Sequence, residues 1–456
     1  MIRASCWPGR FVLAASLFLG CKPGSQDGVA LVGATLIDGS GGPGRANTAI
    51  VVRDGRIESV GPRGDFQLPR RTREVDVSGR WIIPGLIDAH VHLAPARSWA
   101  PARFLAWGVT AVRDAHGGIA SLSTLKKHSS EEAPTGPRVY AAGAMLDGLP
   151  ATYPNAIAVN NENEARKGVD RLVSAGAEFI KTYTRIDPPL LRAIVDEARA
   201  FNLGVSAHLG MTDAVTAAKA GVASIEHLTG VPEAALPNAK SLFGAHYRGF
   251  FPGWTAFERS WADLDSAALA RVARLLADRK VTLVPTLVLH ETLSRLDEPG
   301  LLRDPALQDV PEAEQKDWDV RGLIARAGWT ETDFEAFRKS RANQDLFVRQ
   351  FAAAGGRIAT GTDAPNRMLV PGYSEHREME LLVRAGLTPG EAIRAATRNA
   401  AALIGVDSLG LLATGKVADL LILSKNPLVD IRNTRAITAV MARGYLLDAD
   451  SIRATW

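Results

Sequence analysis

The sequence predicts an α/β fold: a (β/α)8 TIM barrel with a small composite β-sandwich domain formed by the N- and C-terminal segments. Two observations carry this prediction. Strand-like apolar runs alternate with helix-like runs through residues 81–404, which is the pattern of repeated β/α units. Short alternating strands separated by turns lie near both ends of the chain. Neither end holds enough strands for a stable sheet of its own, so we expect the two ends to pair.

The composite β-domain is predicted to join residues 29–80 with residues 405–456. Asp54-Gly55 separates two of its strands and is a strong signal for a two-residue hairpin turn. The strands expected in this domain cover residues 29–37, 49–53, 57–60, 419–423 and 436–442.

The barrel is predicted from strand-like runs that have helical patterns between them, for example at residues 189–201, 211–220 and 267–279. The alternative is an open doubly wound sheet. It is disfavoured because no glycine-rich phosphate loop opens the first helix. The predicted barrel strands cover residues 82–87, 109–113, 139–142, 178–183, 204–207, 224–226, 281–288 and 357–360.

Two connections in the predicted barrel are long, residues 228–264 and residues 290–349. Both leave the C-terminal face, where barrel enzymes build their sites, and long loops are often functional. The first connection is rich in aromatic residues. They form either a satellite core that anchors the insertion or an apolar lid over a substrate. The sequence leaves both interpretations open.

Residues 1–21 are predicted to be an export signal. Two arginines precede an apolar run at residues 11–20, which is too short to span a bilayer but suits a signal peptide. The run ends at Cys21 in a sequence that resembles a bacterial lipobox. We expect export to the periplasm or outer membrane, with a lipid anchor at Cys21; the alternatives are a plain cleaved signal or a buried helix. Cys6 is the only other cysteine, so the rest of the chain has no disulfide and no thiolate metal site.

Polar side chains that can bind metals follow the predicted barrel strands. His90 and His92 are two residues apart, so a strand places both imidazoles on one side, as a divalent metal requires. Four histidines, a lysine and an aspartate all fall at the C-terminal ends of predicted strands, where barrel enzymes carry out their chemistry. Such a grouping is improbable by chance. The candidate site is His90, His92, Lys181, His208, His227 and Asp363.

Lys181 is unusual among these residues because an ammonium group cannot bind a metal. Burial between cations lowers the pKa of a lysine and exposes a nucleophilic amine. Reaction of this amine with CO2 would give a carbamate, whose two oxygens can bridge a pair of metals. The alternative is a lysine that pairs with a carboxylate on the rim. We prefer the carbamate because of the surrounding ligands.

The sequence resembles the amidohydrolase superfamily, in its imidazolonepropionase- and prolidase-like branch. The resemblance covers nearly all of the chain after the signal. It rests on WIIPGLIDAHVH at residues 81–92, GVTAVRD at 108–114, AEFIK at 177–181, SIEH at 224–227, Gly361 to Asp363, GLTPGEAIRAAT at 386–397 and GKVADLLI at 415–422.

This resemblance implies a binuclear metal site. His90 and His92 would hold one metal, carboxylated Lys181 would bridge, and two further histidines, His208 and His227, would hold the second. Asp363 would lie across the pair as the catalytic residue. The expected cofactors are two divalent ions, with zinc as the default for nitrogen and oxygen ligands and manganese, iron or cobalt as alternatives.

The expected reaction is hydrolysis of an amide bond by a metal-bridging hydroxide. Two cations lower the pKa of a bridging water and stabilise the oxyanion. Asp363 would take the proton of that water and deliver it to the leaving amine. The expected substrates are dipeptides, including Xaa-Pro, or N-acyl amino acids. The alternatives are a lactonase or phosphotriesterase on the same metals, or a lipoprotein that binds ligands without turnover.

Three further residues are candidate substrate contacts: Tyr183, His116 and His290. Arg367, just past Asp363, is a candidate for binding a substrate carboxylate. The net charge is +4 and no basic stripe is present, so we expect a small-molecule or dipeptide substrate and no nucleic-acid partner. A homo-oligomer is compatible with the sequence.

Overall fold

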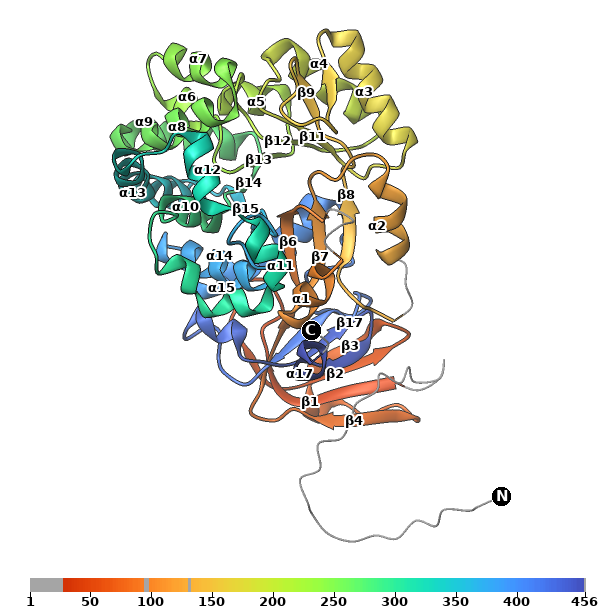
Figure 1. Ribbon diagram of the computed structural model, residues 1–456. Coiled ribbons are helices and arrows are strands. Elements are labelled where there is room, and N and C mark those ends of the chain that lie inside the picture. The colour runs from red at the N-terminus through yellow and green to blue at the C-terminus, as the bar shows by residue number, and fades with distance from the viewer. Residues whose placement is uncertain (1–27, 94–97, 130–132, 455–456) are drawn as a thin grey trace.

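The computed structural model describes residues 28–93, 98–129 and 133–454 (Figure 1). The predicted export signal, residues 1–21, and the predicted lipid anchor Cys21 lie outside the described residues. Across the described ranges, the helices are all too short or too polar to cross a membrane.

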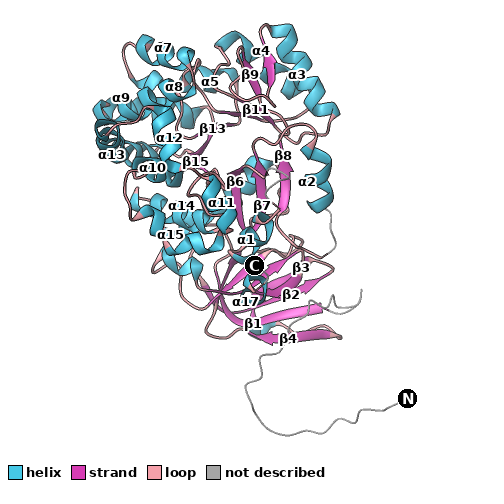
Figure 2. Ribbon diagram, in the orientation of Figure 1, coloured by secondary structure: helices cyan, strands magenta, loops and turns pink. Residues whose placement is uncertain are grey.

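Parallel strands with helices outside them form the larger part of the molecule (Figure 2). One sheet contains β6 (Leu86–Val91), β7 (Val109–Asp114) and β8 (Arg138–Ala141). The second has the order β10, β9, β11, β12, β13, β14, β15, and its strands are β9 (Leu146–Gly148), β10 (Ile157–Val159), β11 (Ile180–Thr182), β12 (Val205–Ala207), β13 (Ser224–Glu226), β14 (Thr282–Val284) and β15 (Arg357–Ile358).

Hydrogen bonds join both edges of the three-stranded sheet to the second sheet. The Ala89 N–H donates to the Thr360 carbonyl at 3.0 Å, which links the first barrel strand to the last. The Glu178 N–H donates to the Ala141 carbonyl at 3.0 Å, which links the third strand to the fourth. The strands therefore close into a TIM-barrel-like ring rather than an open doubly wound sheet.

Helices fill the connections between the barrel strands. The first connections hold α1 (Ala100–Ala106), α2 (Ser121–Ser129), α3 (Glu162–Ser174), α4 (Pro188–Ala200) and α5 (Ala214–Ala220). The two long connections hold α6 (Val231–Ala235), α7 (Lys240–Arg248), α8 (Phe250–Ser260) and α9 (Ser266–Asp278), then α10 (Leu287–Ser294), α11 (Glu312–Asp317), α12 (Val320–Ala327) and α13 (Glu331–Ala353). After β15 come α14 (Tyr373–Arg384), α15 (Pro389–Arg394), a π-helical turn (Ala395–Asn399) and α16 (Ala400–Ile404).

The ends of these helices carry the expected stop and start signals. Asp187 precedes α4, and its side chain accepts a hydrogen bond from the Leu190 N–H. Asp213 caps α5 in the same way, and α5 ends at Gly221 in the left-handed conformation with φ of 97°. Capping satisfies the free backbone groups at helix ends, so local sequence fixes where these helices begin and end.

Two predicted strands differ from the structure. The first, residues 82–87, is divided: β5 (Trp81–Pro84) pairs outside the barrel, and β6 begins at Leu86. The seventh, residues 281–288, ends at Val284 as β14, and α10 begins at Leu287. Pro285 lacks an N–H for the sheet ladder and stops this strand. The apolar run continues as a helix, which periodicity alone does not distinguish from a buried strand.

Strands from both ends of the chain form one eight-stranded sheet (Figure 1). Its order is β18, β17, β16, β5, β1, β2, β3, with β4 paired to β1. The strands are β1 (Gly28–Leu36), β2 (Arg45–Arg53), β3 (Arg56–Pro62), β4 (Thr72–Asp76), β5, β16 (Leu420–Leu423), β17 (Ile437–Ala442) and β18 (Tyr445–Asp448), followed by α17 (Ala449–Arg453). The expected pairing of the two ends is thus present, and a division into two packed layers stays a prediction.

The β2–β3 hairpin shows how local sequence fixes this sheet. Asp54 and Gly55 have φ of 47° and 75°, and two positive φ angles are the mark of a type I′ turn, for which Asp-Gly is well suited. Arg53 pairs with Arg56 across the turn. The hairpin expected at Asp54-Gly55 is therefore present.

Candidate active site

All the predicted metal ligands meet at the C-terminal ends of the barrel strands. His90 lies in β6 and Lys181 in β11. His92, His208 and His227 directly follow β6, β12 and β13, and Asp363 lies shortly after β15. They line one cavity of about 620 Å³: His90, His92, Lys181, His208, His227 and Asp363.

Three of the donor atoms lie close enough to share a cation, and the rings of the other histidines lie beside them. Ligand atoms of His90, His227 and Asp363 lie within 4.8 Å of one another. The ring centroid of His208 is 4.8 Å from that of His227, and the centroid of His92 is 5.3 Å from that of His90. The Asp363 Oδ1 atom is 2.8 Å from His92 Nε2 and 3.3 Å from His90 Nε2. Imidazoles and a carboxylate at this spacing suit a divalent metal.

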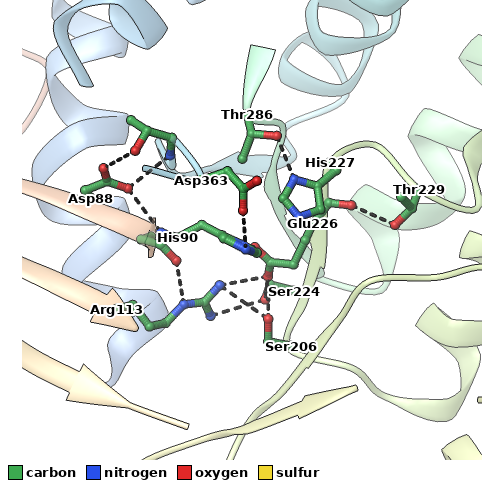
Figure 3. Close-up of polar contacts among 12 residues, drawn as sticks. Asp88, His90, Arg113, Ser206, Ser224, Glu226, His227, Thr229, Thr286 and Asp363 are labelled. Atoms are coloured by element: carbon green, nitrogen blue, oxygen red, sulfur yellow. Dashed lines mark hydrogen bonds and ion pairs between the residues drawn. The ribbon is translucent and has the colours of Figure 1, made fainter. Parts of the chain in front are cut away.

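A buried polar network orients His90 from behind (Figure 3). The Nδ1 atom of His90 lies 2.6 Å from Glu226 Oε2. The other oxygen of Glu226 accepts bonds from Arg113 Nη2 at 2.7 Å, from Ser206 Oγ at 2.7 Å and from Ser224 Oγ at 2.5 Å. A carboxylate at Nδ1 holds the proton there and leaves the Nε2 lone pair free for a metal, as is usual for ligating histidines.

Thr286 orients His227 in a similar way. The Thr286 hydroxyl lies 2.8 Å from His227 Nδ1 (Figure 3). A hydroxyl that accepts the Nδ1 proton leaves Nε2 of His227 as the ligating atom. Two of the four histidines therefore have a defined partner on the nitrogen opposite the one that would bind a metal.

The side chain of Lys181 is buried without a hydrogen-bond partner in the described part of the chain. Lys181 is 1% exposed, and its Nζ atom forms a hydrogen bond with none of the described residues. A buried charge without a partner is costly. Burial lowers the pKa of Lys181 to about 8. A buried amine with a lowered pKa, among four imidazoles and a carboxylate, fits a metal-binding site.

Burial also sets the charge of the other ligands. It lowers the pKa of His208 and of His227 well below the ordinary value, and the positive charge of Lys181 or His90 adds to this. Burial alone would raise the pKa of Asp363, but the adjacent imidazoles, His92 foremost, outweigh it and hold the pKa well below its usual value. Neutral His208 and His227 and an ionised Asp363 are the forms that bind metals. His92 differs: burial alone would lower its pKa, but the adjacent Asp363 carboxylate raises it.

The backbone is strained at three places on this rim. His227, Thr286 and Asp363 have φ of 57°, 47° and 66°, in the left-handed region. Such conformations cost about 1–3 kcal/mol each and gather at functional sites. Asp363 is held by its N–H, which donates to the His90 carbonyl at 2.7 Å, and by Asn366 Nδ2, which donates to its carboxylate at 2.6 Å.

The predicted substrate contacts divide into two groups. Tyr183 and His116 line the cavity, and so does Arg367. The Nδ1 atom of His116 accepts a bond from the Met145 N–H at 3.2 Å, and its Nε2 is 2.8 Å from Asn155 Oδ1. Burial lowers the pKa of His116 to about 4, so this imidazole is neutral at neutral pH.

His290 does not line the cavity among the described residues. It lies in α10 rather than at a strand end, is 1% exposed, and uses both ring nitrogens. Its Nδ1 is 2.5 Å from Glu258 Oε1, and its Nε2 donates to the His227 carbonyl at 3.0 Å. The structure therefore places His290 behind the cavity, where it supports the backbone of His227, and not in a position to touch substrate.

The aromatic residues of the insertion divide between the cavity and the core, and the lid over a substrate stays a prediction. Phe250, Phe251 and Trp254 line the cavity. Phe257 and Trp261 are 1% and 0% exposed and belong to the main core. The first turns of α8 therefore contribute to the cavity wall, while its last turn and the 3-10 turn that follows, Trp261–Asp263, anchor the insertion.

Sequence reasoning missed Glu226 and Arg113, which position His90. A signal was present: both are charged residues within predicted barrel strands, residues 109–113 and 224–226, and the structure buries every residue of these strands. A charged side chain in such a strand needs a charged or hydrogen-bonding partner. Their pairing spans 113 positions of sequence, so the partner could not be named. Trp329, on the α12–α13 connection, also lines the cavity and carried no local signal.

A match to a protein-family model identifies the family to which this chain belongs. The model of the amidohydrolase family matches residues 81–447, which includes every predicted ligand. The chain belongs to the amidohydrolase family. The resemblance inferred from its motifs is thus confirmed.

Individual amidohydrolases are similar along most of the chain. The ochratoxinase of Aspergillus niger is 26% identical over 91% of this chain and 86% of its own length. The imidazolonepropionase of Deinococcus radiodurans is 26% identical over 94% and 96%. The crystal structure of a putative prolidase from Bifidobacterium longum has a TM-score of 0.67 and 27% identity, covering 94% of this chain and 98% of that one. This amidohydrolase is therefore a hydrolase of carbon–nitrogen bonds that acts on amides.

Proposed function

We propose that this protein is an exported, metal-dependent amidohydrolase that cleaves N-acyl amino acids or dipeptides, Xaa-Pro dipeptides among them. The observation that carries the proposal is the convergence of four imidazoles and Asp363 around Lys181, whose buried Nζ has no hydrogen-bond partner among the described residues. The names of similar proteins agree with amide substrates, since one is a putative prolidase and another an ochratoxinase.

The proposed ligands divide between two divalent cations. His90 and His92 would hold one, and His208 and His227 the other. Zinc is the default, with manganese, iron or cobalt as alternatives. When bound, the cations lower the pKa of a water towards neutrality and polarise the scissile carbonyl.

Lys181 would complete the site as a carbamate. Its neutral amine attacks the carbon of CO2, forms the N–C bond and releases a proton to solvent, which gives an anion with two oxygens. The structure supports this step because Lys181 lines the cavity and its buried Nζ atom has no hydrogen-bond partner among the described residues. An anionic group removes the cost of a buried, unpaired ammonium.

Asp363 is the proposed proton carrier. Its carboxylate touches His92 and His90 and is oriented by Asn366. As an ionised group that lines the cavity, it can accept the proton of the attacking water and pass it to the departing amine. The general base and general acid are then one residue acting in sequence.

The proposed location is the bacterial cell envelope. Two arginines, the apolar run at residues 11–20 and the lipobox-like sequence before Cys21 support export and a lipid anchor. Fractionation of cells that express the full chain, followed by mass analysis of the mature N-terminus, tests both. Recovery of the unprocessed chain from the cytoplasm would contradict the proposal.

The test of function is a hydrolysis screen of the chain that begins after Cys21, loaded with zinc or manganese in the presence of bicarbonate. The panel holds dipeptides, N-acyl amino acids, lactones and a phosphotriester. We expect turnover of N-acyl amino acids or dipeptides. Turnover confined to lactones or phosphotriesters would overturn the proposed substrate class, and binding of panel members without any turnover would indicate a ligand-binding protein.

A further inference from the structure

The cavity that holds the candidate ligands is lined by two chemically different sets of residues. The aromatic set of Phe250, Phe251, Trp254 and Trp329 comes from α8 and from the α12–α13 connection. We refer to these four residues as the aryl wall, and Tyr183 stacks on its Phe250 at 15° and 6.2 Å. The polar set comes from other loops and includes His116, Thr152, Asn155, Asn366 and Arg367.

The aryl wall is held in a fixed geometry. Phe250 and Trp254 lie nearly parallel, with an interplanar angle of 25° and centroids 6.0 Å apart. Phe251 and Trp329 meet edge to face at 87° and 6.3 Å. The Trp329 indole N–H donates to Thr255 Oγ1 at 2.8 Å, which ties the two insertions together. Rings fixed in these orientations present stacking and edge contacts to a flat aromatic group.

The aryl wall lies beside one pair of histidines. The ring centroid of His208 is 6.4 Å from that of Phe250 and 6.0 Å from that of Trp254. The centroid of His227 is 6.3 Å from that of Trp254. A substrate group seated against this wall therefore lies next to His208 and His227.

Asp363 defines the side of the leaving amine. A group that delivers a proton must lie within about 2.6–3.2 Å of the atom that receives it, so the amine half of an amide lies beside Asp363. Asn366 and Arg367 follow on the same loop and line the cavity there. They give the amine half polar surroundings with a positive charge, which suits the carboxylate of an amino acid.

From these two placements we infer that the substrate is an amide whose acyl half is a flat aromatic group, bound by the aryl wall, and whose amine half is a polar amino acid. This inference rests on the proposed function and narrows it. The wall then determines specificity through the acyl group and not through the released amine.

Two pairs of substrates test the orientation. N-(2-naphthoyl)-L-alanine against N-acetyl-L-alanine varies the acyl half, and N-acetyl-L-2-naphthylalanine against N-acetyl-L-alanine varies the amine half. We expect the metal-loaded protein to prefer the naphthoyl over the acetyl substrate by at least about tenfold in kcat/KM, the effect of about 1.4 kcal/mol. We expect little preference in the second pair. A preference confined to the second pair would overturn the inference.

Phe250→Leu and Trp329→Leu remove a ring from the wall and keep apolar volume. Either should lower the naphthoyl-to-acetyl ratio about tenfold. The matched control is Tyr247→Leu, the same kind of change in the same insertion at a residue that is 70% exposed and should leave the ratio unchanged. An unchanged ratio in both wall variants would contradict the inference.

A binding measurement separates this inference from the proposed function. Calorimetry with 2-naphthoate and with acetate on the zinc-loaded protein requires no turnover. Tighter binding of 2-naphthoate, weakened by Phe250→Leu but not by Tyr247→Leu, would support the aryl wall even if no amide were cleaved, in which case only the proposed function fails. Equal binding of both acids would overturn the aryl wall, whatever the hydrolysis results.

Discussion

Glu226→Gln tests whether the network behind His90 prepares it to bind a metal. In the wild type, the carboxylate holds His90 Nδ1 at 2.6 Å and balances Arg113 at 2.7 Å. An amide of the same shape keeps the volume but removes the charge. It can also present an N–H to Nδ1, which would favour the wrong tautomer of His90.

The size of the effect follows from burial. Glu226 is 0% exposed and Arg113 is 2% exposed, and loss of one member of a buried ion pair costs about 3–5 kcal/mol of stability. Loss of a carboxylate behind a ligating histidine costs about 10- to 100-fold in metal affinity. We expect both effects in the single variant. In the double variant Glu226→Gln/Arg113→Gln no charge is left unpaired, so stability should largely return while metal affinity stays low.

The assay is competition for zinc between the protein and a chelator of known affinity, with urea unfolding measured in parallel. The control is Glu233→Gln, which removes a buried carboxylate 2.9 Å from His246 Nε2. Neither Glu233 nor His246 is among the described residues that line the cavity. Its zinc affinity should match the wild type. A folded Glu226→Gln protein that binds zinc as tightly as the wild type would refute the reasoning.

Three other changes give separate tests. Lys181→Ala should lose metal and amidase activity together, as measured by elemental analysis and initial rates; full metal content with full rate would exclude a carbamate bridge. Trp261→Ala removes a side chain that is 0% exposed and packs against Phe257 and Phe347, so urea unfolding should show a loss of about 3–5 kcal/mol; a loss below about 1 kcal/mol would contradict this packing. Burial raises the pKa of Glu378 from 4.5 to about 8. The unfolded chain therefore releases this proton first, and wild-type stability should fall between pH 4.5 and 8, by up to about 5 kcal/mol. Glu378→Gln should remove this part of the pH dependence. Identical profiles of unfolding stability against pH for the wild type and the variant would show that the carboxyl is ionised in the folded protein.

The sequence was informative where a local pattern has one structural meaning. A parallel barrel brings the C-terminal ends of its strands to one face, so residues as distant as His90 and Asp363 could be placed together without knowledge of side-chain packing. Asp54-Gly55 predicted its hairpin because few other dipeptides adopt two positive φ angles.

The sequence was less informative where a pattern fits two structures or where the partner is distant. The apolar run at residues 281–288 fits a buried strand and a buried helix equally well, and the structure uses both, which places His290 in α10 behind the cavity. Aromatic residues in the insertion have the same composition whether they line a cavity or fill a core. Glu226 and Arg113 meet only because the barrel closes.

The central claim is that metal ions held by this ligand set carry out amide hydrolysis. The most direct measurement is the metal content and amidase rate of one preparation before chelation, after chelation, and after zinc is restored with bicarbonate. We predict two metal ions per chain, no activity in the chelated protein, and recovery of the rate in step with the metal restored. An undiminished rate of amide hydrolysis in the metal-free protein would contradict the account.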